Sequence, residues 1–182
     1  MDEVLIKLGV ASILDGLGVD RNDRNFLDTP DRVFRLYKEL FEKQFTSLPV
    51  YDEPRNDEMI ILRGHRTWGM CPHHLLPVDY SVSVGYIPTG QVLGLSKLAR
   101  LVEQETSGFR LQESIGPSIT EYLMTKVSSM GAGCIITGKH GCMRIRGVKT
   151  TGDVITSALR GVIFERPEAR AEFFRLAHSS NG

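Results

Sequence analysis

Apolar side chains recur at helical spacing in several parts of the chain. In the first of these parts, Ile6, Val10 and Leu14 fall on one side of a helix. A second stripe begins after Thr29 and Pro30, which are a good N-cap residue and a good first-turn residue. The same spacing predicts five helices, at residues 2–18, 29–41, 96–108, 111–129 and 167–178.

Shorter runs alternate apolar and polar positions, or are apolar throughout, as in β-strands. Between Met143 and Val148, Arg144 and Arg146 alternate with apolar residues, which predicts a strand that points both arginines to one face. Residues 154–163 have no clear period and favour neither a helix nor a strand. The predicted strands are Met59–Leu62, Tyr80–Ile87, Gln91–Leu95, Cys134–Thr137 and Met143–Val148.

Residues 46–57 interrupt the apolar pattern. They contain Pro49 and Pro54 together with Asp52 and Asn56, a composition typical of a linker. We therefore expect an N-terminal helical segment, residues 1–46, followed by a main domain, residues 47–182.

The composition excludes several classes of protein. The 182 residues are 41% hydrophobic and 24% charged with a formal net charge of zero, so nothing indicates a nucleic-acid partner. The apolar runs are far too short to span a bilayer, and Met1-Asp2-Glu3 lacks the positive charge that begins a secretory signal. Three widely spaced cysteines do not form a disulfide framework, and Cys134 has the pattern of a core residue. We therefore expect a cytoplasmic protein with no membrane partner.

Two clusters of cysteine and histidine carry the clearest chemistry. The first is Cys71-Pro72-His73-His74, and the second includes His140 and Cys142. Cys71, His74 and Cys142 would form a Cys2His set, which leaves the fourth position of a catalytic zinc open for water. His73 and His140 would then stand beside the metal as titratable groups.

Two other interpretations of these clusters remain open. A structural zinc site would take a fourth ligand, and either His73 or His140 could supply it. A single cysteine is more often a small buried apolar residue than a ligand. A single histidine is more often a surface or core residue whose hydrogen bonds are satisfied.

Charged residues elsewhere are less distinctive. Ser96 at a helix start, with Lys97 and Arg100 on one face, suits either an anion site or a solvated helix end. The helix dipole alone accounts for Glu113 near another helix start, and Arg32 has the pattern of a surface charge.

Several segments, taken together, resemble one enzyme family. They have that family's order, and from residue 71 to residue 148 they also have its spacing. The segments are TPDRV at 29–33, CPHHLLP at 71–77, GYIPTGQVLGLSKLARLVE at 85–103, LQE at 111–113 and KHGCMRIRGV at 139–148. On these residues the chain resembles GTP cyclohydrolase I over nearly its whole length.

The resemblance implies both a fold and a reaction. The fold is the α+β tunnelling fold, in which antiparallel strands carry helices on one face and the strands of several subunits join into a barrel. Such subunits assemble as a homodecamer of two stacked pentamers with sites at subunit interfaces. The reaction is zinc-dependent opening of the guanine imidazole ring of GTP at C8, which releases formate and forms 7,8-dihydroneopterin triphosphate.

The resemblance also implies a role for each matched residue. It gives Cys71, His74 and Cys142 as the zinc ligands, and His73 and His140 as the acid–base histidines. It gives Glu113, with Gln112 beside it, as the group that holds the guanine edge. The implied triphosphate ligands are Ser96, Lys97, Arg100, Arg146 and, from a neighbouring subunit, Arg32.

The chain departs from the family pattern at a few positions. Pro72 stands where the family usually has glutamate, and Gly147–Ser157 is about two residues shorter than usual and contains Asp153. These departures keep two alternatives open: a family member with altered nucleotide specificity, and a non-catalytic tunnelling-fold protein that binds zinc or nucleotide.

Overall fold

The computed structural model describes residues 1–43, 48–53 and 57–178 of the chain. The described residues belong to two compact units, Met1–Lys43 and Gln44–Gly182. The predicted boundary between residues 46 and 47 lies outside the described residues. Within the described part, no helix combines the length and the hydropathy needed to cross a membrane.

The first unit contains two helices, α1 (Glu3–Gly16) and α2 (Thr29–Phe41). The carboxylate of Asp2 caps α1 by accepting the N–H of Leu5 at 3.0 Å. Thr29, the predicted N-cap of α2, is instead its first helical residue, and Asp28 precedes the helix. Lys7 joins the two helices because its ammonium lies 2.5 Å from the carboxylate of Asp31.

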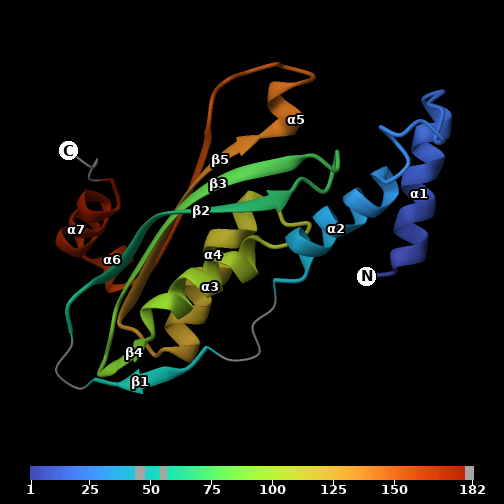
Figure 1. Cartoon of the computed structure of the whole chain (residues 1–182). Coiled ribbons are helices and arrows are strands. Elements are labelled where there is room, and N and C mark those ends of the chain that lie inside the picture. The colour runs from blue at the N-terminus through green and yellow to red at the C-terminus, as the bar shows by residue number, and fades with distance from the viewer. Residues whose placement is uncertain (44–47, 54–56, 179–182) are drawn as a thin grey trace. The chain divides into compact units, whose positions relative to one another are not determined.

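An antiparallel sheet forms the centre of the second unit (Figure 1). Its strand order is β2 (Ile60–Met70), β3 (Pro77–Ile87), β5 (Gly131–His140) and β6 (Val154–Gly161). A separate pair joins β1 (Val50–Asp52) to β4 (Gln91–Leu93). Residues 154–163, which have no clear period, form β6 and the start of α6 (Val162–Glu165).

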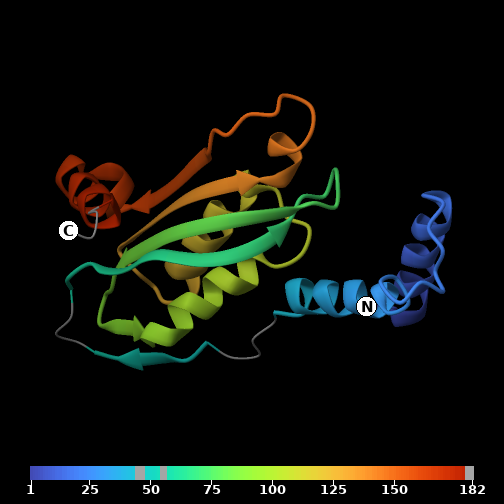
Figure 2. The ribbon, with the colours of Figure 1, turned by 45° about the horizontal axis from the view of Figure 1, so that its top comes forward.

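Two helices, α3 (Leu95–Thr106) and α4 (Gln112–Lys126), cover one face of this sheet, as both views show (Figures 1 and 2). Their apolar stripes pack on the alternate residues of the central strands. The buried core contains Val78, Tyr80, Val82, Val84 and Tyr86 of β3, Ala132, Cys134 and Ile136 of β5, Leu98, Leu101 and Val102 of α3, and Ile115, Ile119 and Leu123 of α4. The predicted α+β class, with antiparallel strands and helices on a sheet face, is confirmed.

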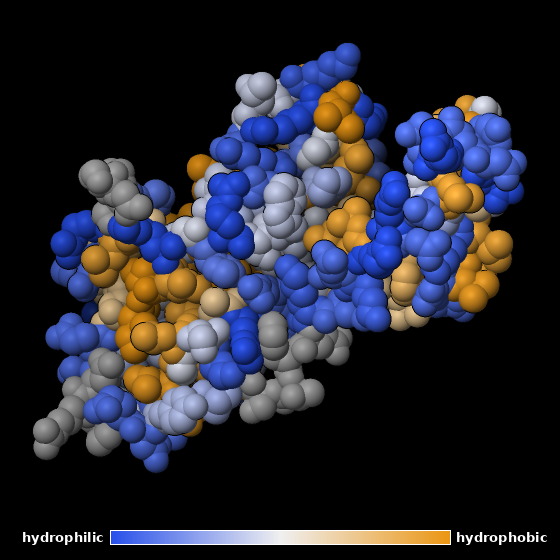
Figure 3. All heavy atoms as spheres, viewed as in Figure 1, coloured by the Kyte–Doolittle hydropathy of each residue, from blue (hydrophilic) through white to orange (hydrophobic). Residues whose placement is uncertain are grey.

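A smaller core lies against the other residues of the same strands. It includes Ile135 of β5 and Phe173 of α7 (Pro167–His178), the helix that was predicted with these bounds. Gly133 allows this packing, because a Cβ there would lie 2.8 Å from the ring of Phe173. Figure 3 shows apolar side chains gathered on this face beside α6 and α7.

Two further local predictions are wrong. Met143–Val148 is not a strand: α5 (Gly141–Arg144) begins directly after β5, and Gly147 and Lys149 follow with positive φ angles of 60° and 48°. The pairing of β5 with β6 ends at Gly138, so among the residues that the structure describes no neighbouring strand extends the sheet here. Ser96 does not cap α3, because the helix already begins at Leu95.

Candidate metal centre and active site

A tight turn between β2 and β3 carries the first cysteine and histidine cluster. Cys71 directly follows β2, its N–H donates to the carbonyl of Leu76 at 2.9 Å, and its own carbonyl accepts the N–H of Leu75 at 3.0 Å. Leu75 has a φ of 53°, a left-handed conformation that reverses the chain. The turn brings the imidazole of His74 back to Cys71, with 3.7 Å between Nδ1 and Sγ.

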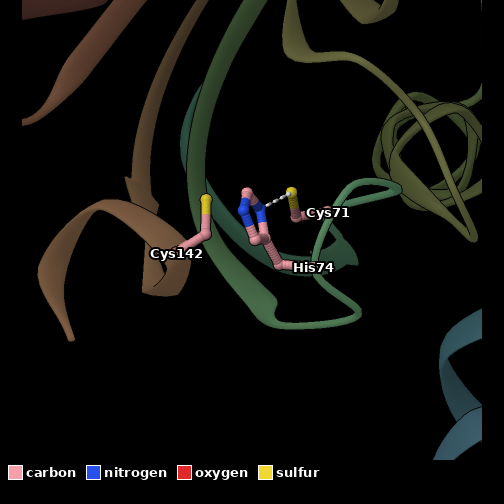
Figure 4. A group of neighbouring side chains, drawn as sticks. All are labelled: Cys71, His74 and Cys142. Atoms are coloured by element: carbon pink, nitrogen blue, oxygen red, sulfur yellow. Dashed lines mark hydrogen bonds between the residues drawn. The ribbon is translucent and has the colours of Figure 1, made fainter. Parts of the chain in front are cut away.

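The register of the sheet brings the second cluster to the same place. Val78 of β3 pairs with His140 of β5, so the residues after His140 lie beside those before Val78. Gly141 makes the approach possible, since a Cβ there would lie 3.0 Å from the carbonyl oxygen of Pro77. Cys142, in the single turn of α5, therefore faces His74 across the sheet end (Figure 4).

The donor atoms of Cys71, His74 and Cys142 all lie within 4.8 Å of one another. In Figure 4 the imidazole lies between the two thiols. Bond lengths of about 2.3 Å to sulfur and 2.0–2.1 Å to nitrogen put the ligand atoms of a tetrahedral zinc roughly 3.5–3.8 Å apart. These three side chains therefore fit a metal ion with small adjustments and leave a fourth position open.

The surroundings of Cys142 shift the pKa of its thiol. Burial raises the pKa of the Cys142 thiol, and the neighbouring Cys71 thiol raises it further. A cation held by both sulfurs would favour their thiolate forms, which are the forms that bind metal. Cys134 differs, because its complete burial raises its pKa to about 12 and, as predicted, it belongs to the core.

His73 and His140 flank this metal-binding group in different surroundings. His73 is exposed on the turn, and its Nδ1 lies 4.0 Å from the sulfur of Cys71. His140 is partly buried at the end of β5, where Tyr80 meets its ring edge-on at 6.2 Å between centroids. Burial lowers the pKa of His140, and the charge of Glu113 acts in the opposite direction.

Gln112 and Glu113 begin α4 but point to different surroundings. Glu113 is exposed in the first turn, near enough for its charge to affect the pKa values of His140 and Tyr80. Gln112 is buried, and its Oε1 lies 2.7 Å from Nε2 of His140. Both residues therefore lie at the same end of the sheet as the metal-binding group.

Arg144, the last residue of α5, and Arg146, two residues later, separate instead of sharing a face. Nη1 of Arg146 lies 2.5 Å from Nε2 of His74, which places a cation beside the metal-binding group. Arg144 pairs with Asp153 at 3.2 Å and also donates to the carbonyl of Thr151 at 3.3 Å. Of the two, only Arg146 is placed to meet a ligand at the metal-binding group.

Within the second unit, the predicted residues at the start of α3 are not brought to the metal-binding group. Ser96, Lys97 and Arg100 lie in the first turns of α3, which follows the end of β3 that is distant from Pro77. Only the last turn of α3 returns towards Met70, so Ser96 lies about 15 Å further back along the helix. Arg32 belongs to the first unit, where it pairs with Asp28 at 3.3 Å.

Two residues that shape the site, Tyr80 and Gly138, were not identified from the sequence. Tyr80 has the pattern of a strand core residue, yet its ring contacts His140. Gly138 leaves room for the contact between Gln112 and His140, because a Cβ there would lie 2.1 Å from Oε1 of Gln112.

The fold and this cluster define an α+β protein with a candidate Cys–His–Cys metal centre flanked by two imidazoles and a carboxylate. The family model described as GTP cyclohydrolase I matches residues 6–178. The chain belongs to the GTP cyclohydrolase I family and is an enzyme of that family.

Individual relatives match over almost their whole length. A GTP cyclohydrolase 1 from Caldanaerobacter subterraneus subsp. tengcongensis is 37% identical over 185 residues, which cover 98% of each chain. Another from Dehalococcoides mccartyi is 40% identical over 182 residues, which cover 96% of each chain. Among solved structures, an archaeosine synthase QueF-Like in the apo form matches 57% of this chain and 93% of its own, with 20% identity and a TM-score of 0.47.

Proposed function

We propose that this protein is a zinc-dependent GTP cyclohydrolase I. It opens the imidazole ring of the guanine of GTP at C8, releases formate and forms 7,8-dihydroneopterin triphosphate. The observation that carries the proposal is the convergence of a Cys–His–Cys group, two further imidazoles and Glu113 at one sheet end, in a chain of this family.

Cys71, His74 and Cys142 hold the zinc ion. When bound, zinc lowers the pKa of a water in its open position to about 7 and so supplies the nucleophile for C8. The thiolates and the imidazole suit zinc better than magnesium or calcium, which prefer oxygen ligands.

His73 and His140 transfer protons during ring opening. Protonation of N7 makes C8 more electrophilic, and His140 is the donor to N7. His73, exposed on the turn beside Cys71, exchanges protons with the opening ring and the departing formate. Imidazoles suit both directions of transfer because their ordinary pKa lies near neutral pH.

Glu113, with Gln112 beside it, holds the guanine edge. A carboxylate can accept two N–H bonds from the pyrimidine side of guanine, and this pairing fixes the base against the metal. The exposure of Glu113 at the start of α4, near His140, supports this role.

Replacing Glu113 by glutamine is expected to raise KM for GTP and to weaken discrimination against ATP. The amide keeps the shape of the side chain but loses charge-assisted acceptance from the guanine edge. Steady-state kinetics with both nucleotides measure the effect, and unchanged GTP over ATP selectivity would exclude the recognition role. Glu121→Gln, an exposed substitution later in the same helix, is the matched control.

The triphosphate is bound by Ser96, Lys97, Arg100 and Arg146, and by Arg32 of a neighbouring subunit. The start of α3 is distant from Cys71 within one chain, which supports a site completed by a second subunit. We therefore propose a homo-oligomer, a decamer of two stacked pentamers, whose sheets join into the barrel of the tunnelling fold. We also propose that residues 1–46 form a helical segment, that residues 47–182 form the catalytic domain, and that the protein is cytoplasmic.

Lys97→Ala and Arg146→Ala are each expected to weaken binding of GTP far more than binding of guanosine. Removing a cation that contacts phosphate affects only the ligand that carries the phosphates. Calorimetric titration with both ligands measures the difference, and equal losses for both would assign these residues a structural role. Because Arg146 contacts His74, metal content is measured in the same samples.

The experiment that tests the proposed function combines the protein, zinc and GTP. Formate release together with growing pterin fluorescence is the expected result. Formate without the pterin product would mean that the reaction stops after ring opening. Binding of GTP without turnover would favour a non-catalytic binding protein, and turnover of another nucleotide would favour altered specificity.

A further inference from the structure

The side-chain amide of Gln112 has a complete set of partners inside the protein. The residue is 2% exposed at the start of α4. Its Nε2 donates to the carbonyl oxygens of Ile136 at 3.1 Å and Val154 at 2.9 Å. A third, longer contact joins Nε2 to the hydroxyl of Thr156 at 3.3 Å. The amide thus ties α4 to two neighbouring strands, β5 and β6.

These contacts fix which way the amide faces. Reversing it would point Oε1 at the carbonyl oxygens of Ile136 and Val154, neither of which can donate a hydrogen bond. Oε1 therefore points at Nε2 of His140, at 2.7 Å. Since Oε1 can only accept, Nε2 of His140 is the donor, and Nδ1 is the nitrogen left for other partners.

The packing around this contact is built for it. Gly138 lies beneath the two side chains, and a Cβ there would lie 2.1 Å from Oε1 of Gln112 and 3.1 Å from Nε2 of His140. Tyr80 closes another side of the imidazole with an edge-on ring contact. The imidazole of His140 is therefore held both by a directed hydrogen bond and by its neighbours.

We propose that Gln112 is a positioning residue that orients the imidazole of His140, rather than a residue that binds the guanine itself. Its amide has neither an unused oxygen nor an unused N–H pointing outward, whereas its neighbour Glu113 is exposed. This inference rests on the proposed role of His140 in proton transfer. It assigns that transfer to Nδ1, which must itself be protonated before it donates to N7, and it fixes one ring orientation.

Gln112→Met tests the proposal, because methionine has a similar volume and no amide. The expected result is a fall in kcat of at least about tenfold, the scale of a misplaced reacting group, with KM for GTP and zinc content unchanged. A residue that binds guanine would instead raise KM and weaken GTP over ATP selectivity. A residue needed only for folding would lower zinc content, and either of these results would overturn the proposal.

Two further variants keep the test decisive. Thr156→Val removes only the longest contact of the amide and is expected to keep wild-type kcat. Gly138→Ala would place a Cβ 2.1 Å from Oε1 of Gln112 and 3.1 Å from Nε2 of His140, so it is expected to break this contact and to reproduce the loss of kcat.

Combining Gln112→Met with His140→Ala separates this inference from the proposed function. If Gln112 acts through His140, the double variant has the same kcat as His140→Ala alone. Additive losses would overturn the inference and leave the role of His140 intact. Wild-type turnover by His140→Ala would overturn both, since no proton transfer would then depend on that imidazole.

Discussion

Cys142→Ala is expected to abolish both metal binding and turnover. The substitution leaves Cys71 and His74, and two protein ligands do not hold zinc tightly. Without a bound metal no acidified water is available for attack at C8, so formate release should fall to background. Elemental analysis of the purified protein and a formate assay measure the two effects on the same sample.

Cys134→Ala is the matched control for this prediction. Cys134 of β5 is fully buried between the sheet and the helices, several residues along the strand from the metal-binding group, and its burial keeps the thiol protonated. Its loss should lower stability modestly through a small cavity and leave zinc stoichiometry unchanged. Full zinc occupancy in Cys142→Ala would exclude Cys142 as a ligand, and zinc loss in Cys134→Ala would mean that the metal has another site.

Replacing either His73 or His140 by alanine should lower formate release by roughly a hundredfold or more, the usual scale for a lost acid–base group. Zinc content and oligomer size should stay unchanged, because neither imidazole belongs to the three-ligand group. GTP should still bind through Glu113 and the phosphate ligands. Formate assays, elemental analysis and size-exclusion chromatography provide the three measurements.

This prediction separates a catalytic zinc from a structural one. If His73 or His140 were the fourth ligand of a structural zinc, its loss would remove metal and assembly with no separate catalytic defect. His178→Ala, at the exposed end of α7, is the matched control and should behave as wild type. Wild-type turnover by both His73→Ala and His140→Ala would reject the proposed mechanism while leaving the family assignment standing.

The sequence by itself indicated the candidate metal ligands Cys71, His74 and Cys142 and the positions of the longer helices. Cys71 and His74 lie within one turn, so their approach is local, and thiol and imidazole are distinctive ligands wherever they occur. The helices were equally visible, because α3, α4 and α7 each bury one stripe that recurs at helical spacing.

Other features depended on partners distant in the chain. Met143–Val148 has the alternation of a strand, but a strand needs a neighbour, and the pairing of β5 with β6 ends before it. Arg146 therefore reaches His74 from a turn after α5, and Arg144 turns to Asp153 instead.

Only the tertiary structure separated Gln112 from Glu113. The two residues are adjacent in sequence, and the sequence pattern places both at the start of the same predicted helix. Successive residues on a helix point about 100° apart, so one side chain enters the core while the other remains exposed. Which of them enters is decided by the acceptors that the strands offer, the carbonyl oxygens of Ile136 and Val154. Those acceptors lie 24 and 42 residues away in the chain, and no local pattern encodes such a contact.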